Sequence, residues 1–277
     1  MMTDSVMEPI EMNFREQLRR ARTIVVKVGT RVFVQPEGCV AVEVLNGLVK
    51  SIATLRLSGR RVLLVSSGAV GIGANHLKIS PGMVSVCAAA GQSVLTSMYQ
   101  NAFALLEVAA AQILVTDDDF TDADRHERLR STLQHLTRLG VVPIINENHV
   151  ATDAEDRQSD RRIFSENDML ASLVATAVGA DLLVLLTDVD GVYDGHPNHG
   201  NASLIPQITG GVDDFELAEQ VGELSRGGIK AKLRAVAHAV ETNRLVAVIA
   251  NGRTPDVLEN IVRGQQIGTL IAPAEAQ

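Results

Sequence analysis

The chain has 277 residues, which is enough for one large α/β domain or two small domains. Apolar residues make up 46% of it, aromatic residues only 3%, and Trp is absent, so the core must consist of Val, Leu, Ile and Ala. That composition favours a parallel sheet buried under helices over an aromatic-rich sandwich. The formal net charge of −8 argues against a broadly basic surface, and with it against nonspecific nucleic-acid binding.

Cysteine content and hydropathy both indicate a soluble, cytoplasmic protein. The two cysteines, Cys39 and Cys87, are too few for a disulfide framework. The N-terminus carries acidic residues where a secretory signal needs basic ones, and no apolar run approaches the roughly 20 residues that span a bilayer. We therefore expect a cytoplasmic location and no membrane partner.

Short apolar runs alternate with longer amphipathic ones along the chain. The short runs predict strands buried on both faces: Thr23–Val28, Arg61–Ser66, Gln112–Thr116, Val141–Asn146, Asp181–Thr187 and Leu245–Ala250. The amphipathic runs predict helices over about Val40–Leu57, Val84–Leu106, Arg125–Leu139, Asn167–Val178 and Ile229–Thr242. This alternation implies right-handed crossovers and a mostly parallel sheet.

Local signals mark several helix ends and loops. Ser165 to Asp168 form a capping-box pattern before an apolar run. Gly59 and Gly140 follow helical segments, as C-terminal capping glycines do. The charged stretch Thr152–Arg162 and the segment His196–Ser203 are predicted to be loops.

Polar and glycine residues recur directly after the predicted strands. They are Gly29-Thr30, Ser67-Gly68, Asn146-Glu147-Asn148 and Asp188. In open α/β sheets the ligand binds beyond the carboxyl ends of the strands. These positions therefore indicate a binding site.

Common catalytic signatures are missing or incomplete. No G-x-x-x-x-G-K-[ST] phosphate-binding loop occurs. Gly71-Ile-Gly73 opens like a dinucleotide fingerprint, but His76 stands at its third glycine position and no strand directly precedes it. Asp188-Val-Asp190-Gly191 fails as a calcium loop because Leu186 and Pro197 occupy ligand positions. We predict no metal site built from protein side chains.

Two lysine–glycine clusters are candidate anion sites. Lys27 interrupts an apolar strand just before Gly29, and it either meets a phosphate at the strand end or simply leaves the core there. Gly227-Gly228 precede a helix start with Lys230 and Lys232 in its first turn. Cations there oppose the helix dipole unless a polyphosphate binds; the alternative is a flexible linker with solvated lysines.

Three polar clusters have an ordinary structural explanation beside a functional one. Ser66-Ser67-Gly68 form a turn whose amides either hold an anion or only cap a helix. In Glu166-Asn167-Asp168, the acids either serve the helix dipole or place Asp168 against the two lysines and Asn167 against a substrate. Thr187-Asp188 lead into a common turn sequence. Together with the lysines, these clusters describe phosphoryl transfer without a P-loop.

The order of these motifs resembles the amino-acid kinase family, and within it the glutamate 5-kinases and the kinase half of the bifunctional pyrroline-5-carboxylate synthases. The resemblance covers roughly residues 22–272, which leaves 1–21 as an N-terminal extension and 273–277 as a tail, with no RNA-binding-like or reductase domain after it. The matching stretches are Val25–Thr30, Val65–Ala69, Ala88–Gln92, Ala111–Thr116, Val141–Asn148, Gly179–Asp188, and Gly227-Gly228 with Lys232.

The resemblance implies a three-layer αβα sandwich and the ATP-dependent phosphorylation of the side-chain carboxylate of L-glutamate, the entry step to proline. It assigns Lys27 and Lys232 to neutralising the phosphoryl groups and Asp168 to orienting those lysines. Mg²⁺ would enter with ATP and bridge its phosphates. The family also implies a homo-oligomer, a dimer or tetramer, formed through helices near residues 84–106. A carboxylate nucleophile is already ionised near neutral pH, so no general base is needed.

Two sets of binding residues follow from the same matches. The substrate set is Ser67, Gly68, Asn148, His149 and Asn167. The nucleotide set is Lys27, Thr187, Asp188, Arg226, Gly227, Gly228, Ile229, Lys230 and Lys232.

The sequence departs from the family pattern at the substrate loop. His149 stands where the family has an acid that binds the substrate amino group, and Asp153 or Asp156 from the following loop is the candidate replacement. This departure motivates a second hypothesis, a sister kinase acting on N-acetylglutamate or aspartate. A third hypothesis is a non-catalytic amino-acid or nucleotide sensor. The presence of Lys27, Asp168 and Lys232 argues against it. The smaller departures are Arg31 for a serine, Glu166 for an aspartate, and Ser225-Arg226 for Gly-Thr.

Overall fold

A computed structural model of the chain describes residues 14–36, 38–152, 166–195, 202–210 and 229–274. Strands within these ranges form one sheet with the order β3-β4-β2-β1-β5-β7-β8-β6. Six neighbouring pairs are parallel, and β7 pairs with β8 in the antiparallel sense. The prediction of an α/β fold with a mostly parallel sheet is confirmed.

The strands are β1 Thr23–Val28, β2 Arg61–Ser66, β3 Ala110–Val115, β4 Val142–Glu147, β5 Leu182–Thr187, β6 Gln207–Thr209, β7 Val246–Asn251 and β8 Thr269–Ala272. The longer helices are α3 Val42–Leu57, α4 Ala69–Leu77, α5 Val84–Ala104, α7 Ala123–Arg138, α8 Asn167–Val178 and α10 Ile229–Asn243. The shorter helices are α1 Phe14–Arg20, α2 Thr30–Phe33, α6 Asp118–Thr121 and α11 Val257–Val262.

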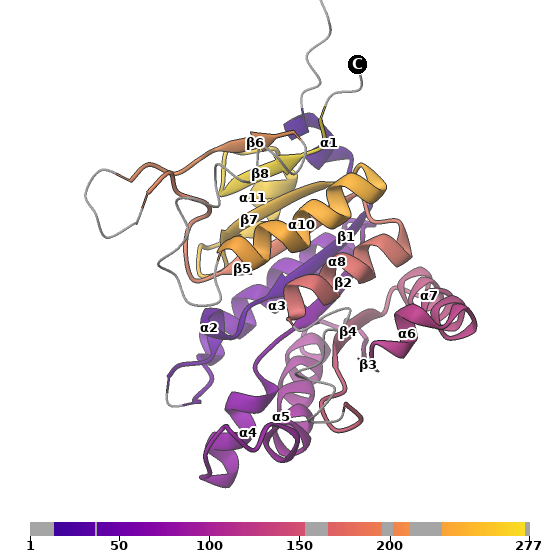
Figure 1. Cartoon of the computed structure of the whole chain (residues 1–277), viewed down its shortest axis with the longest axis vertical. Coiled ribbons are helices and arrows are strands. Elements are labelled where there is room, and N and C mark those ends of the chain that lie inside the picture. The colour runs from indigo at the N-terminus through magenta and orange to yellow at the C-terminus, as the bar shows by residue number, and fades with distance from the viewer. Residues whose placement is uncertain (1–13, 37, 153–165, 196–201, 211–228, 275–277) are drawn as a thin grey trace, which may run out of the picture.

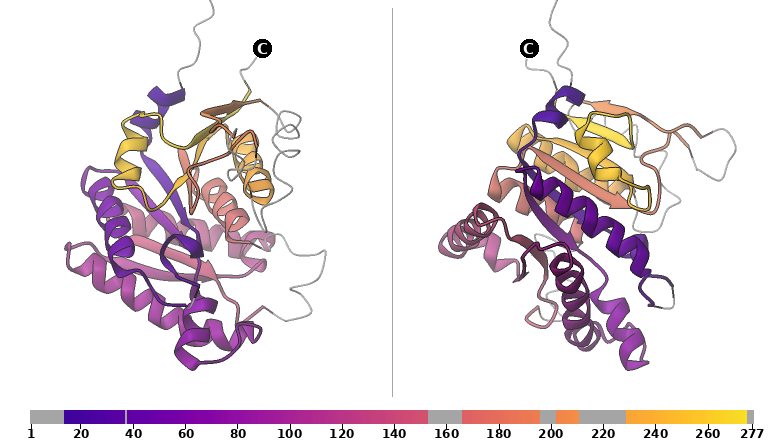
Figure 2. Two further views of the ribbon diagram at one scale, coloured as in Figure 1. Left: turned by 90° about the vertical axis from the view of Figure 1, so that its left-hand side faces the viewer. Right: turned by 180° about the vertical axis from the view of Figure 1, so that it is seen from behind.

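Helices cover both faces of the sheet, which gives the predicted three layers. Helices α8 and α10 lie side by side over one face (Figure 1), whereas α3 and α11 lie over the opposite face (Figure 2). Within the described residues, no helix is long and apolar enough to cross a membrane.

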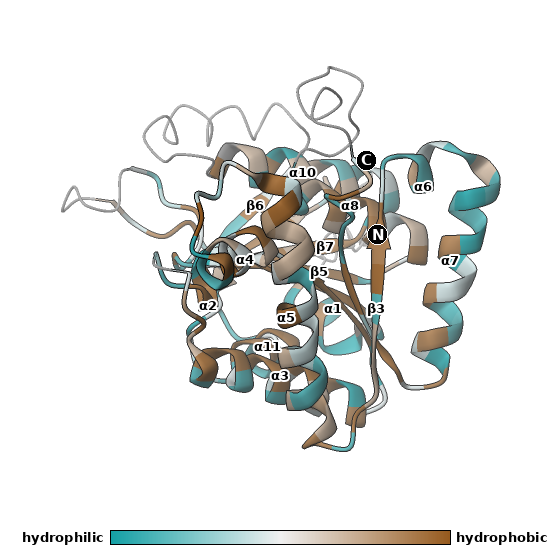
Figure 3. Ribbon diagram, turned by 90° about the horizontal axis from the view of Figure 1, so that it is seen from below, coloured by the Kyte–Doolittle hydropathy of each residue, from teal (hydrophilic) through white to brown (hydrophobic). Residues whose placement is uncertain are grey.

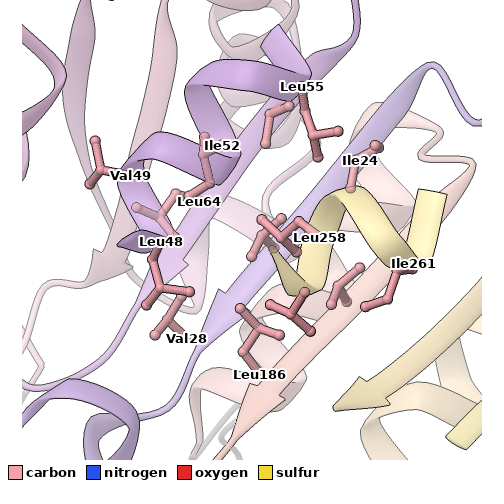
Figure 4. Close-up of a cluster of buried hydrophobic side chains, with 14 of the residues drawn as sticks. Ile24, Val28, Leu48, Val49, Ile52, Leu55, Leu64, Leu186, Leu258 and Ile261 are labelled. Carbon is pink, nitrogen blue, oxygen red and sulfur yellow. The ribbon is translucent and has the colours of Figure 1, made fainter. Parts of the chain in front are cut away.

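Two apolar clusters hold the layers together, one on each face of the sheet. All six residues of β1 are buried, and its side chains alternate between the clusters, so that Ile24 and Val26 face α3 and α11 while Val25 faces α8 and α10. Figure 3 shows hydrophobic colouring along the central strands and hydrophilic colouring over much of α7. Each fully buried aliphatic side chain contributes about 1.5–3 kcal/mol. Figure 4 labels part of the first cluster: Ile24, Val28, Leu48, Val49, Ile52, Leu55, Leu64, Leu186, Leu258 and Ile261.

The six predicted strands all occur, with ends shifted by at most two residues, but β6 and β8 were not predicted. These two strands have three and four residues, too few for a periodic pattern. Ser165, the first residue of the predicted capping box, lies outside the described residues. Glu166 is the N-cap of α8 and makes no side-chain capping bond, and the Asp168 carboxylate contacts Lys27 and Lys232. Gly59 and Gly140 have positive φ angles after their helices, as expected.

The strand order places a binding site at the end of β1. The chain passes from β1 through α3 to β2 on one side, whereas α8 leads into β5 on the other side of β1. Helices of opposite faces therefore diverge beyond the carboxyl end of β1, which is where ligands bind in open α/β sheets.

Candidate active site

A cavity of about 360 Å³ opens at this point of the sheet. The carboxyl ends of β1, β2, β4 and β5 and the N-terminal turns of α4, α8 and α10 contribute its walls. The residues that line the cavity include Lys27, Gly29, Arg31, Ser67, Gly68, Asn146, Glu147, His149, Asn167, Asp168, Thr187, Asp188 and Lys232.

One buried carboxylate pairs with two ammonium groups in the lining of the cavity. Lys27 Nζ lies 2.7 Å from Asp168 Oδ1, and Lys232 Nζ lies 3.0 Å from Asp168 Oδ2. The three side chains are 7%, 13% and 3% exposed for Lys27, Lys232 and Asp168. Two cations around one anion leave a net charge of +1 in a protein whose overall charge is −8. The group therefore presents a positive site to an anionic ligand.

Burial and pairing shift the pKa values of this group in definite directions. Burial is the largest influence on Lys27 and, helped by repulsion from Lys232, lowers its pKa in spite of Asp168. For Asp168, burial acts to raise the pKa, but attraction and hydrogen bonding to both lysines outweigh it, so the pKa is lowered. The carboxylate thus stays ionised, while Lys27 is easier to deprotonate than an exposed lysine.

Helices α8 and α10, which carry Asp168 and Lys232, are joined by a hydrogen bond about one helical turn further along. Asp168 lies in the first turn of α8 and Lys232 in the first turn of α10. The Ser172 hydroxyl of α8 donates to the Ala235 carbonyl of α10. On the other side, Gly29 follows β1 and packs so closely against the β5 backbone that an added Cβ would lie 3.2 Å from Leu186 O.

Amide and hydroxyl groups gather on the β2–β4 side of the cavity. Asn167 Nδ2 lies 2.8 Å from Ser67 Oγ and 3.0 Å from Asn146 Oδ1, donating to both. Gly68 is the N-cap of α4 and has a φ of 111°, a left-handed conformation that favours glycine. Ser67, Gly68 and Asn167 thus lie together, as the sequence predicted.

The two loop residues predicted for the substrate differ in where they lie. His149 lines the cavity, and its Nδ1 is 3.4 Å from Glu147 Oε1. Asn148 is not among the cavity-lining residues, and its Oδ1 accepts a bond of 3.3 Å from Ala151 N within the turn. Its side chain therefore stabilises the loop. The candidate replacement acids Asp153 and Asp156 lie outside the described residues.

Two of the predicted nucleotide residues, Thr187 and Asp188, lie on the β5 side of the cavity. Thr187 Oγ1 lies 3.1 Å from Asp188 Oδ1, and Asp188 Oδ2 is 3.2 Å from Arg31 Nε. Ile229 begins α10 and is not among the lining residues. The remaining predictions, Arg226, Gly227, Gly228 and the Lys230 side chain, lie outside the described residues.

Several lining residues were not in the predicted site sets. Asn146 and Glu147 end β4, and Arg31 is the third residue after β1. Position after a strand was the signal that could have selected all three. Gln92 is a different case. It lies in the matching stretch Ala88–Gln92, in the middle of α5, and reaches the site only through Asn146, a contact that the sequence does not show.

A doubly covered, mostly parallel sheet whose strand ends enclose two lysines on one aspartate defines an α/β protein with a candidate anion site that is not a P-loop. The chain belongs to the amino acid kinase family, whose model matches residues 22–251.

Curated relatives are similar over nearly the whole chain. A glutamate 5-kinase of Lactiplantibacillus plantarum is 37% identical over 263 residues, which cover 91% of this chain and 97% of that protein. A glutamate 5-kinase of Chromohalobacter salexigens is 40% identical over 95% of this chain and 69% of its own length. The Delta-1-pyrroline-5-carboxylate synthase 2 of Oryza sativa is 36% identical over 91% of this chain, but over only 37% of its own length.

Solved structures share the fold at low sequence identity. Carbamate kinase from Giardia lamblia bound to AMP-PNP has a TM-score of 0.67 and 16% identity, covering 92% of this chain and 99% of that chain. UMP kinase from Bacillus anthracis has a TM-score of 0.65 and 16% identity, covering 92% and 97%. At this identity the similarity concerns the fold.

Proposed function

We propose that the protein transfers the γ-phosphoryl group of MgATP to the side-chain carboxylate of L-glutamate, giving L-glutamyl 5-phosphate and ADP. The observation that carries this proposal is the pair of ammonium groups, from Lys27 and Lys232, held on Asp168 within one cavity. The glutamate 5-kinases among the relatives support the choice of glutamate.

For this reaction the protein must bring two anions together, the glutamate carboxylate and the ATP phosphates. The glutamate γ-carboxylate attacks the γ-phosphorus, the bond from that phosphorus to the bridging oxygen breaks, and ADP leaves. The nucleophile is ionised near neutral pH, so no side chain has to remove a proton. Lys27 and Lys232 lower the repulsion between carboxylate and phosphates, and Asp168 keeps both in place before ATP arrives.

The amino acid and the nucleotide would bind on opposite sides of the cavity. Ser67 and Asn167 would contact the amino acid, while Thr187 and Asp188 would contact the nucleotide. Glu147 brings a carboxylate beside His149, so the region that the family pattern assigns to the substrate ammonium still contains an acid. Mg²⁺ would enter as part of the MgATP substrate, on phosphate and water oxygens.

The wider role follows from the same proposal. The reaction would be the first step of proline biosynthesis in the cytoplasm, and the enzyme would act as a homo-oligomer.

Trapping the acyl phosphate with hydroxylamine tests the proposal. The protein is incubated with MgATP and, separately, L-glutamate, N-acetyl-L-glutamate, L-aspartate, carbamate or UMP, and hydroxamate and ADP are both measured. We expect hydroxamate and matching ADP with L-glutamate. Product from N-acetylglutamate or aspartate alone would favour the sister-kinase hypothesis, which His149 motivates, and binding without any product would favour a sensor.

A further inference from the structure

A chain of buried side-chain amides connects the middle of α5 to the amino-acid side of the cavity. Gln92 Nε2 donates to Thr96 Oγ1 over 3.1 Å, and Asn146 Nδ2 donates to Gln92 Oε1 over 2.8 Å. Asn146 Oδ1 in turn accepts from Asn167 Nδ2 over 3.0 Å. Gln92 and Asn146 are 9% and 2% exposed, so water is largely excluded from these bonds.

The hydrogen bonds along this chain all have the same direction: Asn167 donates to Asn146, Asn146 to Gln92, and Gln92 to Thr96. An amide has its two hydrogens on nitrogen and its lone pairs on oxygen, so the orientation of one amide determines that of the next. Gln92 offers its oxygen to Asn146, and Asn146 must then offer its own oxygen to Asn167. Asn146 Oδ1 also accepts from the backbone N–H of Glu147 over 2.9 Å, which favours the same orientation.

At the cavity this direction decides which atoms meet a ligand. Asn167 Nδ2 has two hydrogens, and Asn146 Oδ1, Ser67 Oγ and Ser66 O are the acceptors within reach. The Asn167 nitrogen is therefore committed to the protein, which leaves its oxygen as the group for a ligand. Ser67 Oγ accepts from Asn167, which leaves its hydroxyl hydrogen to be donated.

We propose that Gln92 is a positioning residue for the amino-acid substrate: through Asn146 it orients Asn167 and Ser67 so that they present one acceptor and one donor to the ligand. An acceptor matches an ammonium group and a donor matches a carboxylate, so the pair fits a zwitterionic amino acid. The inference rests on the proposed function for the identity of that amino acid. Gln92 itself does not line the cavity.

Steady-state kinetics of Gln92 variants test the proposal, after wild-type turnover of L-glutamate has been checked. Gln92→Met keeps an unbranched side chain but removes both polar atoms. We expect the KM for glutamate to rise roughly tenfold, as the loss of about one buried hydrogen bond implies, with kcat and the KM for ATP changed less than about twofold. Gln92→Glu keeps an acceptor for Asn146 and should restore most of the wild-type KM.

Coupling separates positioning from a purely structural role. If Gln92 acts through Asn167, the double variant Gln92→Met with Asn167→Ala should have the same KM for glutamate as Asn167→Ala alone. The proposal would be overturned if the two substitutions multiplied their effects on the KM for glutamate in the double variant. It would also be overturned if Gln92→Met raised the KM for glutamate and the KM for ATP equally, or left the KM for glutamate unchanged. Ser93→Ala is the matched control, because Ser93 is exposed on the same helix and donates to Ala90 O; its KM should stay unchanged.

A second variant keeps the test decisive if Gln92→Met does not fold. Thr96→Val preserves the side-chain shape but removes the acceptor that orients the Gln92 amide. We expect a rise of roughly threefold in the KM for glutamate, and no change would contradict the proposal. If the wild type phosphorylates another amino acid, the proposed function fails, and the same variants are measured with that substrate.

Discussion

Asp168 shows how one residue can make a costly buried charge useful. Burying Lys27 without a partner would cost several kcal/mol, and a single carboxylate offsets this for two lysines at once. The three side chains together carry a net charge of +1, which favours binding of a polyphosphate. The free enzyme therefore holds ready the charge that the proposed reaction needs.

Removing either lysine should abolish most of the activity. We expect Lys27→Ala and Lys232→Ala each to lower kcat/KM by about 10²–10³, as loss of one preorganised charge contact does. Circular dichroism should show that both variants remain folded, because Asp168 keeps one partner in each. Normal turnover in both variants would refute the assignment of these lysines to the phosphates.

The pH dependence of kcat/KM should reflect the lowered pKa of Lys27. The log of kcat/KM, which reports the free enzyme, should fall as pH rises through a pKa below the ordinary lysine value of about 10.4. Activity is lost on the alkaline side, because deprotonation removes the charge. Asp168→Asn removes the attraction that opposes this shift, so its alkaline limb should move to still lower pH. A limb that Asp168→Asn leaves in place would contradict this explanation.

The sequence indicated the role of Lys27 more clearly than the contacts of Gln92 and Asn146. Lys27 was recognisable because it is the one charge in an apolar strand next to a glycine. Asn146 lies at a predicted strand end and Gln92 in a stretch that matches the family pattern, but neither signal indicates that the two amides bond to each other. Only the packing of α5 against β4 shows that they bond to each other.

The contact between α4 and α5 explains the glycines that opened like a dinucleotide fingerprint. A Cβ on Gly73 would overlap the Cys87 carbonyl, and a Cβ on Gly91 would overlap the Ala69 carbonyl. The two helices therefore approach each other backbone to backbone. Gly73 serves helix packing, and the same contact holds α5 where Gln92 reaches Asn146.

Adding one methyl group at this contact should destabilise the fold. We expect Gly91→Ala to lower the free energy of unfolding by at least about 1–3 kcal/mol, the usual cost of overpacking. Gly47→Ala is the matched control: Gly47 is exposed within α3, nothing lies within 4 Å of an added Cβ, and the change should stabilise by about 0.5–1 kcal/mol. Urea unfolding measures both, and equal stabilities would contradict the proposed close contact.

Elements were predicted well where a buried pattern is long. The two-face burial of β1 and β5 requires continuous apolar residues, which are visible in the sequence. Helix α4 was missed because its glycines, needed for the contact with α5, reduce the helical signal. The antiparallel pairing of β8 with β7 depends on residues far apart in the chain, so no local pattern could show it.

At the scale of the whole molecule, the residues proposed for the two substrates lie on opposite sides of β1. Ser67, Asn146 and Asn167 stand on the β2–β4 side, Thr187 and Asp188 on the β5 side, and Lys27 lies between them. The amino-acid kinase pattern predicted this convergence from motif order. The sequence did not predict how His149 is accommodated, because its contact with Glu147 depends on how the loop turns after β4.

Ligand binding should stabilise the protein in thermal unfolding. A ligand at about 100 times its Kd adds about 2.7 kcal/mol, which is several degrees in Tm for a chain of this size. We expect L-glutamate with a non-hydrolysable MgATP analogue to raise the Tm more than either ligand alone. D-glutamate, with the same charge, should give a much smaller shift. Equal shifts from the two enantiomers would argue against a specific amino-acid site.

The most direct test of the central claim is a crystal structure with L-glutamate and a non-hydrolysable MgATP analogue bound. The account predicts that the Lys27 and Lys232 ammonium groups both lie within hydrogen-bonding distance, about 2.7–3.2 Å, of phosphate oxygens. The glutamate γ-carboxylate should face the γ-phosphorus, with its amino-acid end at Ser67 and Asn167. Phosphates bound away from either lysine, or glutamate bound outside this cavity, would contradict it.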